Sequence, residues 1–319
     1  AAGFSTCTVS KALSGQKGVN AGTRVLIEKV ARRLGYVPKA AASALRGGHP
    51  PVVGVFAYFE ESWAPTQILW GMGRELPQHG LHMLLYNSEQ SEVTNRRLSQ
   101  ALEEGSLGAV AAVGPNVLGK EILGKVKDWG MPLVTVLYKE EGIHSIEVDN
   151  VHGGRLAAEH LAPLCRSFFV VEDIHLQTEG EARIQGFREG LGEAGIRAGA
   201  LKTARFDRPP AARMRAWGQG LLLRTRPAGI FVPCGDVFAM AVLQGLLARG
   251  LKPKKDFFLI GYDNLDFAEL CYPGLSTVAQ PLRFLGETAA KMIATFYRSP
   301  ASEPMNQLLQ PSLVLRATA

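Results

Sequence analysis

The spacing of apolar positions changes along the chain near residue 51. Before it, residues 5–14 and 23–34 place apolar side chains at helical intervals, with Val9 and Leu13 on one face of the first segment. Ser5 supplies a suitable N-cap for that segment, and GQKGVN supplies the turn that follows it. The pattern therefore predicts two short helices near the N-terminus.

From residue 51 the pattern changes to short β-rich runs that alternate with amphipathic helical runs. The predicted strands lie at 52–58, 81–87, 109–113, 133–137, 168–172, 229–233 and 257–262. The predicted helices between them include 94–104, 154–164, 181–194 and 238–249. This order predicts an α/β fold with mainly parallel, doubly wound sheets, and the length suits two lobes of about 150 residues each.

Two segments, SIEVDN near residue 147 and LSTVAQP near residue 278, are the places where the chain is expected to cross between the lobes. The predicted divisions are a head, 1–38, a hinge or linker, 39–50, and a core, 51–319, with lobe one at 51–146 and 280–302 and lobe two at 147–279 and 303–319. Ligands of doubly wound sheets bind outside the carboxyl ends of the strands, so the cleft between the lobes is the predicted binding site.

Charge is concentrated in the first 50 residues. They hold eight Lys and Arg residues and a single acid, Glu28, which gives this segment a formal charge of +7. Because the whole chain carries +6, the other 269 residues carry −1. A short basic module attached to a nearly neutral core is typical of contact with nucleic acid, and the alternative is a solvated basic face.

Several classes of protein and site find no support in the sequence. No apolar run approaches the length of a membrane span and no signal peptide is evident, so we expect a cytoplasmic protein without membrane contact. Its four cysteines are far apart, and its histidines match no ligand spacing, so we expect neither metal nor disulfides. No nucleotide, nucleophile-elbow or metalloprotease motif is present, so we expect no cofactor and no enzymatic activity.

The motifs, taken together, resemble one known family. TVSKALSG, followed by GVNAGTRVLIEKVARRLGYVPKAAASALRGG, resembles the DNA-binding head and hinge of the LacI/GalR (lactose-repressor/galactose-repressor) family of bacterial transcription regulators. VVGVF, VDNVHGGRLAAEHL, EARIQGFREGL, FFLIGYDN and LSTVAQP then follow in the order of the family's effector-binding core. The resemblance implies a helix-turn-helix head on a type I periplasmic-binding-protein-like core. One departure is that the family's first helix precedes the AAGFS turn, in which this chain begins, so we expect only part of the head's core.

The resemblance implies that the helix starting near Ser5 is a recognition helix, which enters the major groove of DNA. Its outer face would place four further side chains against DNA: Thr6, Cys7, Ser10 and Lys11. Lys11 suits guanine or phosphate, whereas Cys7 lacks a strong donor and offers apolar contact at most.

The Ala-rich segment KAAASALRGG matches the family's hinge helix. Its leucine, Leu45, matches a residue that relatives wedge into the minor groove, where an apolar side chain unstacks a base step and kinks the duplex. On the alternative interpretation Leu45 only packs the linker. Two hinges are needed for such a wedge, so a homodimer on near-palindromic operator DNA follows from the resemblance.

Two cleft residues are carried over from sugar-binding relatives. Arg183 and Asp263 match an Arg and an Asp that hydrogen-bond sugar hydroxyls, and a guanidinium fork facing a carboxylate suits vicinal hydroxyls. The alternatives are a surface ion pair for Arg183 and a cap or turn for Asp263. Asp236 matches an Asp that follows an Asn in relatives, which here is replaced by Cys234-Gly235. It is predicted either to touch ligand or to cap the next helix.

Two aromatic residues complete the predicted cleft. Trp63 lies in FEESWAPTQ, the loop after the first strand, and an aromatic plane there could stack on a sugar face; alternatively it closes a lobe surface. Tyr138, at a strand end, is a candidate of the same kind.

The sequence therefore predicts a transcriptional regulator, in particular a repressor, controlled by a sugar or sugar derivative. The alternative is a sugar-binding protein of the periplasmic type without DNA-binding activity. Salt-dependent binding to duplex DNA separates the two, since affinity for phosphates falls steeply with salt.

Overall fold

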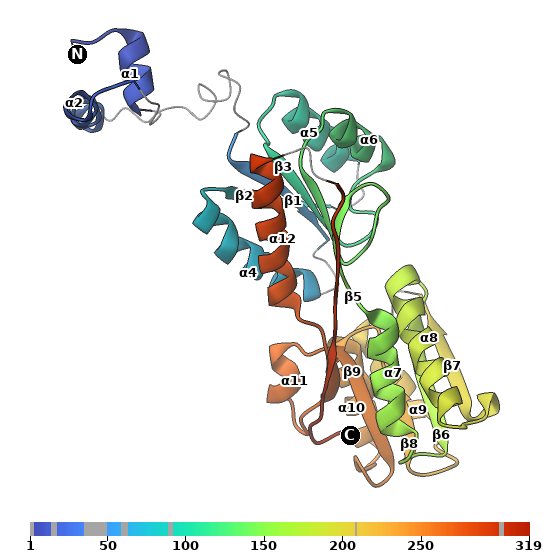
Figure 1. The fold of residues 1–319 in the computed structure, drawn as a ribbon. Coiled ribbons are helices and arrows are strands. Elements are labelled where there is room, and N and C mark those ends of the chain that lie inside the picture. The colour runs from blue at the N-terminus through green and yellow to red at the C-terminus, as the bar shows by residue number, and fades with distance from the viewer. Residues whose placement is uncertain are drawn as a thin grey trace.

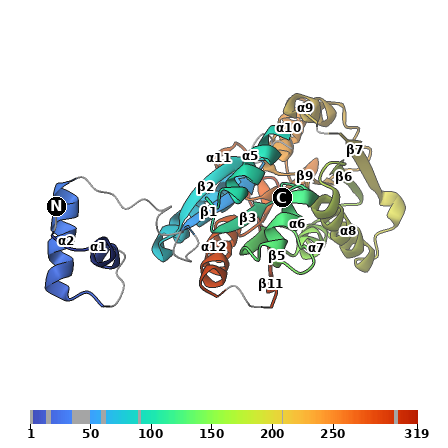
Figure 2. The same ribbon diagram turned by 90° about the horizontal axis from the view of Figure 1, so that it is seen from above.

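The computed structural model of the protein describes residues 3–13, 18–34, 50–58, 63–88, 92–207, 209–299 and 303–319. The head contains α1 (Thr6–Leu13) and α2 (Ala21–Arg33), which cross each other in Figure 2. The Ser5 hydroxyl accepts the Thr8 amide at 3.2 Å and so caps α1, as its position predicts. Ala12 of α1 and Ile27 of α2 are each 1% exposed, the most deeply buried side chains described in the head.

Lobe one is built on a parallel sheet of six described strands, in the order β11-β5-β4-β3-β1-β2. These are β1 (Val52–Ala57), β2 (His82–Asn87), β3 (Ala109–Val113), β4 (Leu133–Val136), β5 (His144–Val148) and β11 (Asn306–Leu309). In Figure 1, α4 (Ala64–Glu75) and α12 (Leu282–Arg298) cover one face, and α5 (Glu92–Glu103) and α6 (Lys120–Asp128) cover the other. A short 3-10 turn, η1 (Leu76–His79), follows α4. Each face has its own buried apolar cluster, as a doubly wound sheet requires.

Lobe two repeats this architecture with the order β12-β10-β9-β8-β6-β7. Its described strands are β6 (Ser167–Asp173), β7 (Leu201–Phe206), β8 (Ala228–Phe231), β9 (Phe257–Asp263), β10 (Ser276–Ala279) and β12 (Ser312–Val314), the last antiparallel to β10. Its helices are α7 (Asn150–Leu161), α8 (Gln177–Glu193), η2 (Ala198–Ala200), α9 (Ala211–Gly220), α10 (Asp236–Leu247) and α11 (Asp266–Leu270). The predicted α/β fold with two doubly wound lobes is confirmed.

The described chain crosses between the lobes at three places. These are the β5–α7, β10–α12 and β11–β12 junctions. The last differs from the predicted division, which gave all of 303–319 to lobe two: β11 pairs with β5 in lobe one, for instance Asn306 with Ser145. β11 has the sequence NQLL, which contains no β-branched residue and gives no local indication of a strand. It forms a strand because it pairs with β5, which is distant in the sequence.

Candidate functional site

The candidate cleft lies where the carboxyl ends of the lobe-two strands meet the crossing from β10 to α12. β9 ends at Asp263, whose backbone has φ 109°, and Asn264 follows at φ 56°. Residues other than glycine rarely adopt such positive φ values, and backbone strain of this kind concentrates at functional sites. The carboxylate of Asp263 is therefore held in place by a backbone conformation that costs free energy to maintain.

Arg183, on α8, is fixed by three contacts. Its Nε donates to Asn150 Oδ1 at 2.8 Å and its Nη1 donates to the Pro233 carbonyl at 2.8 Å. Its guanidinium carbon lies 3.9 Å from the centre of the Tyr262 ring. Arg183 is only 7% exposed and makes no ion pair with another described residue, so the surface-pair interpretation is wrong.

Close packing of α7 against α8 sets the position of Arg183. A Cβ added to Gly154 on α7 would lie 2.7 Å from the Phe187 amide nitrogen and closer still to the Arg183 carbonyl oxygen. Gly186 on α8 is packed in the same way against the Val151 backbone. The two glycines let the helices approach until their backbones touch, which brings Arg183 within reach of Asn150.

Gln280 is a cleft residue that the sequence reasoning missed. It lies in the crossing between β10 and α12 and is 7% exposed, and its Nε2 donates to Asp263 Oδ1 at 2.6 Å. Its Oε1 is buried and has no hydrogen-bond partner among the described residues. The only sequence signal was its place in LSTVAQP, where the chain was expected to change lobes.

Asp236 is fully buried beneath the cleft. Its Oδ2 accepts the Leu265 amide at 2.9 Å, and its Oδ1 accepts the Thr277 hydroxyl at 2.6 Å. Burial, and then the nearby charge of Asp263, raise the pKa of Asp236 to about 8. Burial also raises the pKa of Asp263, against the opposing influence of Arg183. Asp236 therefore ties the start of α10 both to the segment between β9 and α11 and to β10.

The two predicted aromatic residues lie in different surroundings. Trp63, at the N-terminus of α4, is 59% exposed, and its ring centre lies 6.3 Å from that of Phe267 on α11, edge to face. It therefore connects lobe one to lobe two. Tyr138 packs against the cluster of lobe one that faces α5 and α6, and burial raises its pKa.

In the head, α1 carries the residues predicted to contact DNA, and the hydroxyl oxygen of one of them, Ser10, is buried. Thr6, Cys7 and Lys11 are exposed, and Ser10 is half-buried. The Ser5 hydroxyl is engaged in the cap of α1, which limits what it can offer to DNA. Leu45 lies outside the residues that the structure describes.

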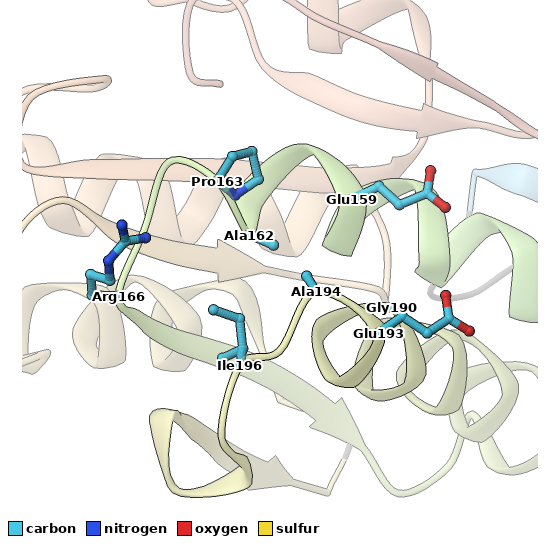
Figure 3. Close-up of a pocket in the computed structure, with 8 residues that line it drawn as sticks. All are labelled: Glu159, Ala162, Pro163, Arg166, Gly190, Glu193, Ala194 and Ile196. Atoms are coloured by element: carbon cyan, nitrogen blue, oxygen red, sulfur yellow. The ribbon is translucent and has the colours of Figure 1, made fainter.

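The described residues hold another hollow, which lies away from the cleft, but neither a metal site nor a membrane-spanning helix. The hollow, of about 560 Å³, lies between the carboxyl-terminal ends of α7 and α8. Figure 3 shows the residues that line it, with Glu159, Arg166 and Glu193 among them. It lies at the opposite end of those helices from Asn150. No group of His, Cys, Asp or Glu side chains in the described ranges is arranged to hold a metal ion. None of the helices described is long and apolar enough to cross a membrane.

Two family models match the chain. Residues 1–39 match the bacterial regulatory proteins of the lacI family, and residues 158–319 match the periplasmic binding protein-like domain. The chain belongs to the LacI family of bacterial transcription regulators. This LacI-family chain is thus a DNA-binding regulator with an effector-binding core.

Similar proteins support the same placement. The HTH-type transcriptional repressor PurR of Yersinia pestis bv. Antiqua is 27% identical over 325 residues, covering 99% of this chain and 93% of the relative. The Lac repressor dimer bound to operator and the anti-inducer ONPF is a structural neighbour with a TM-score of 0.84 at 24% identity, covering 99% and 96% of the two chains. The CelR–cellobiose complex is a structural neighbour with a TM-score of 0.73 at 23% identity, covering 100% of this chain and 97% of its own. These structures share the fold of the LacI-family chain, and the matched relatives are regulators, not enzymes.

Proposed function

We propose that this regulator is a cytoplasmic repressor whose binding to operator DNA is controlled by a sugar or sugar derivative in the cleft between its lobes. The observation that carries the proposal is a guanidinium, Arg183, held in place close enough to act electrostatically on Asp263, a buried carboxylate on strained backbone. Donor and acceptor held in this way suit adjacent hydroxyl groups. Among its structural neighbours, CelR is bound to cellobiose and a regulator from Enterococcus faecium to ribose; the latter has a TM-score of 0.75 at 22% identity, covering 84% and 98% of the two chains.

α11 offers a physical route from the cleft to the relative position of the lobes. It begins three residues after Asp263, and the side chain of Leu265, just before it, is buried in the apolar cluster of lobe one. Asp266 pairs with Arg283 of lobe one at 3.6 Å, and Phe267 meets Trp63. A ligand that shifts Asp263 would therefore also shift the contact between the lobes, which is the kind of two-state element that coupling needs.

Two exposed apolar patches, one on each lobe, suit contact with a second copy of the chain. On lobe one, the edge strand β2 has three apolar side chains, Met83, Leu84 and Leu85, that are 37–44% exposed. At the end of α11, Leu270 and Tyr272 are 82% and 97% exposed. Exposed apolar edges favour association, so we assign these two patches to the interface of the homodimer.

The head and hinge divisions, 1–38 and 39–50, belong to the same proposal. The formal charge of +7 in residues 1–50 serves phosphate contact, and Thr6, Cys7, Ser10 and Lys11 face the DNA. Leu45 is proposed as the minor-groove wedge. The chain without DNA-binding activity is not favoured, because that interpretation leaves the basic head without a role.

Calorimetric titration tests the effector half of the proposal. The chain is titrated with neutral pentoses and hexoses, in parallel with Asp263→Ala. A saturable signal in the unsubstituted chain that Asp263→Ala abolishes is expected. Binding that survives Asp263→Ala would place the effector elsewhere.

A further inference from the structure

Two loops at the amino end of the lobe-two sheet carry a concentration of positive charge. Residues 221–227, between α9 and β8, and 248–256, between α10 and β9, hold six Lys and Arg residues and one acid. The two loops therefore have a formal charge of +5, although residues 51–319 as a whole carry −1. All six cations are exposed: Arg224, Arg226, Arg249, Lys252, Lys254 and Lys255.

Hydrogen bonds hold these two loops side by side. The Arg226 guanidinium donates to the Asp256 carboxylate at 3.0 Å, and the Lys252 amide donates to it at 2.9 Å. Arg249 donates from its guanidinium to the Leu221 carbonyl oxygen. The acid of the two loops is therefore neutralised within them. Within the described part of the chain, four of the six cations make no ion pair or side-chain hydrogen bond: Arg224, Lys252, Lys254 and Lys255.

The order of the sheet brings further cations into line with the loops. β9, β8, β6 and β7 are neighbours in that order and are parallel, so their amino ends lie together. An exposed cation stands at or just before the start of each strand: Lys255, Arg226, Arg166 and Lys202 respectively. Because neighbouring strands are about 4.8 Å apart, the row extends for about 14 Å. That is about four base-pair steps along a DNA duplex.

This basic row lies away from the effector cleft. β9 begins beside the loops and ends at Asp263 in the cleft, so the row and the cleft are at opposite ends of the sheet. Figure 1 shows this end of lobe two, near the labels β6 and β8, as the end farther from lobe one. The hollow in Figure 3 is lined by Glu159 and Glu193 as well as Arg166. The strongest positive charge is therefore at the β8 and β9 end of the row.

We propose that this row and the two loops form a second DNA-binding surface, which contacts duplex phosphates without reading their sequence. Lys and Arg side chains that neutralise phosphates supply binding of this kind. The alternative partner is an acidic protein, but lysine is depleted in protein–protein interfaces, and three of the four unpaired cations are lysines. A chain bound to DNA through its head would hold a second stretch of duplex on lobe two. This surface goes beyond the proposed function, because neither the sugar nor operator recognition is needed for it.

The test asks whether the full chain joins two duplexes. A biotinylated duplex of random sequence is immobilised, the chain is bound to it at low salt, and capture of a second, fluorescein-labelled duplex is measured as salt is raised. Arg224→Gln/Lys252→Gln/Lys254→Gln removes three of the unpaired cations. This variant should still bind the first duplex through its head. Its affinity for the second duplex should be lower, and the slope of log affinity against log salt should be less steep by about two to three units.

The matched control removes the same charge from scattered positions. Lys120→Gln/Arg215→Gln/Lys291→Gln changes three exposed cations on α6, α9 and α12, which share no surface with the row. It should capture the second duplex as the unsubstituted chain does. Thermal unfolding of both variants checks that they are folded. If the first variant is unstable, Lys252→Gln alone makes the same test, with an expected change in slope of about one unit.

Three results would overturn the proposal. The unsubstituted chain could fail to capture a second duplex, or the two triple variants could capture it equally well. In the third case, polyglutamate of matched charge displaces the second duplex as effectively as unlabelled duplex does. The surface would then accept polyanions in general, acidic proteins included, and its assignment to DNA would be wrong.

Discussion

The packing of α7 on α8 gives a sharp test of how the cleft is held together. In Gly154→Ala, the new Cβ would lie 2.7 Å from the Phe187 amide nitrogen, whereas ordinary contacts begin near 3.4 Å. The Arg183 carbonyl oxygen is closer still. Both atoms belong to the backbone of α8 and cannot rotate away, so the two helices must separate by on the order of 1 Å.

That separation has two measurable costs. Overpacking of this kind destabilises by about 1–3 kcal/mol, and for lobes of this size each kcal/mol lowers Tm by about 2–4 °C. The expected fall in Tm is therefore about 2–12 °C. The 2.8 Å hydrogen bond from Arg183 Nε to Asn150 Oδ1 spans the same two helices, so it should break. Hydrogen bonds to charged groups contribute about 1.5–3 kcal/mol to stability, and an Arg183 that is no longer held by Asn150 should bind the effector more weakly.

The assay combines thermal unfolding followed by circular dichroism with calorimetric titration of a bound sugar. Gly192→Ala, in the same helix α8, is the matched control because a Cβ there meets nothing within 4 Å. It should leave affinity unchanged and raise stability by at most about 1 kcal/mol, the helix-propensity gain of alanine over glycine. If Gly154→Ala melts with the unsubstituted chain and binds sugar equally well, the close crossing does not position Arg183.

Three further predictions follow from the site and the head. Arg183→Lys should abolish sugar binding and lower Tm, since lysine cannot satisfy Asn150 and Pro233 together; sugar titration and thermal unfolding check both. The raised pKa of Asp236 means that the folded state holds a proton that the unfolded state releases, so stability should fall as pH rises from about 4 towards about 8. Asp236→Asn should flatten this pH dependence of the unfolding free energy, measured by urea unfolding between pH 5 and 9. An unchanged pH dependence in the variant would contradict the pKa shift. Lys11→Gln should reduce the salt dependence of DNA binding by about one unit of slope, and an unchanged slope would mean that Lys11 contacts no phosphate.

The fold was largely predictable where strands are continuous apolar runs. β1, β3 and β9 are buried on both faces, so VVGVFA, AVAAV and FFLIGYD read as strands from their own composition. β10 and β12 were not predicted, because segments of four and three residues become strands only by pairing with other segments, as Val278 of β10 does with Tyr262 and Leu313.

The cleft was predictable only in part, for a related reason. Arg183 and Asp263 match residues that bind sugar hydroxyls in relatives, whereas Asn150 and Gln280 lie in the motifs VDNVHGGRLAAEHL and LSTVAQP with no role carried over to them. Gln280 and Asn150 gain their importance from three-dimensional contacts, since each hydrogen-bonds a side chain at least 17 positions away. No periodicity or local composition marks such a residue.

The most direct test of the central claim is to measure whether effector and DNA affect each other's binding. The chain is used to select duplexes from a random pool, and its affinity for the enriched site is measured with and without a saturating sugar from the titration. We expect a near-palindromic site whose affinity changes with the sugar, and a change of the same factor in sugar affinity when DNA is saturating. A sugar and a DNA site that both bind but leave each other's affinity unchanged would contradict the claim.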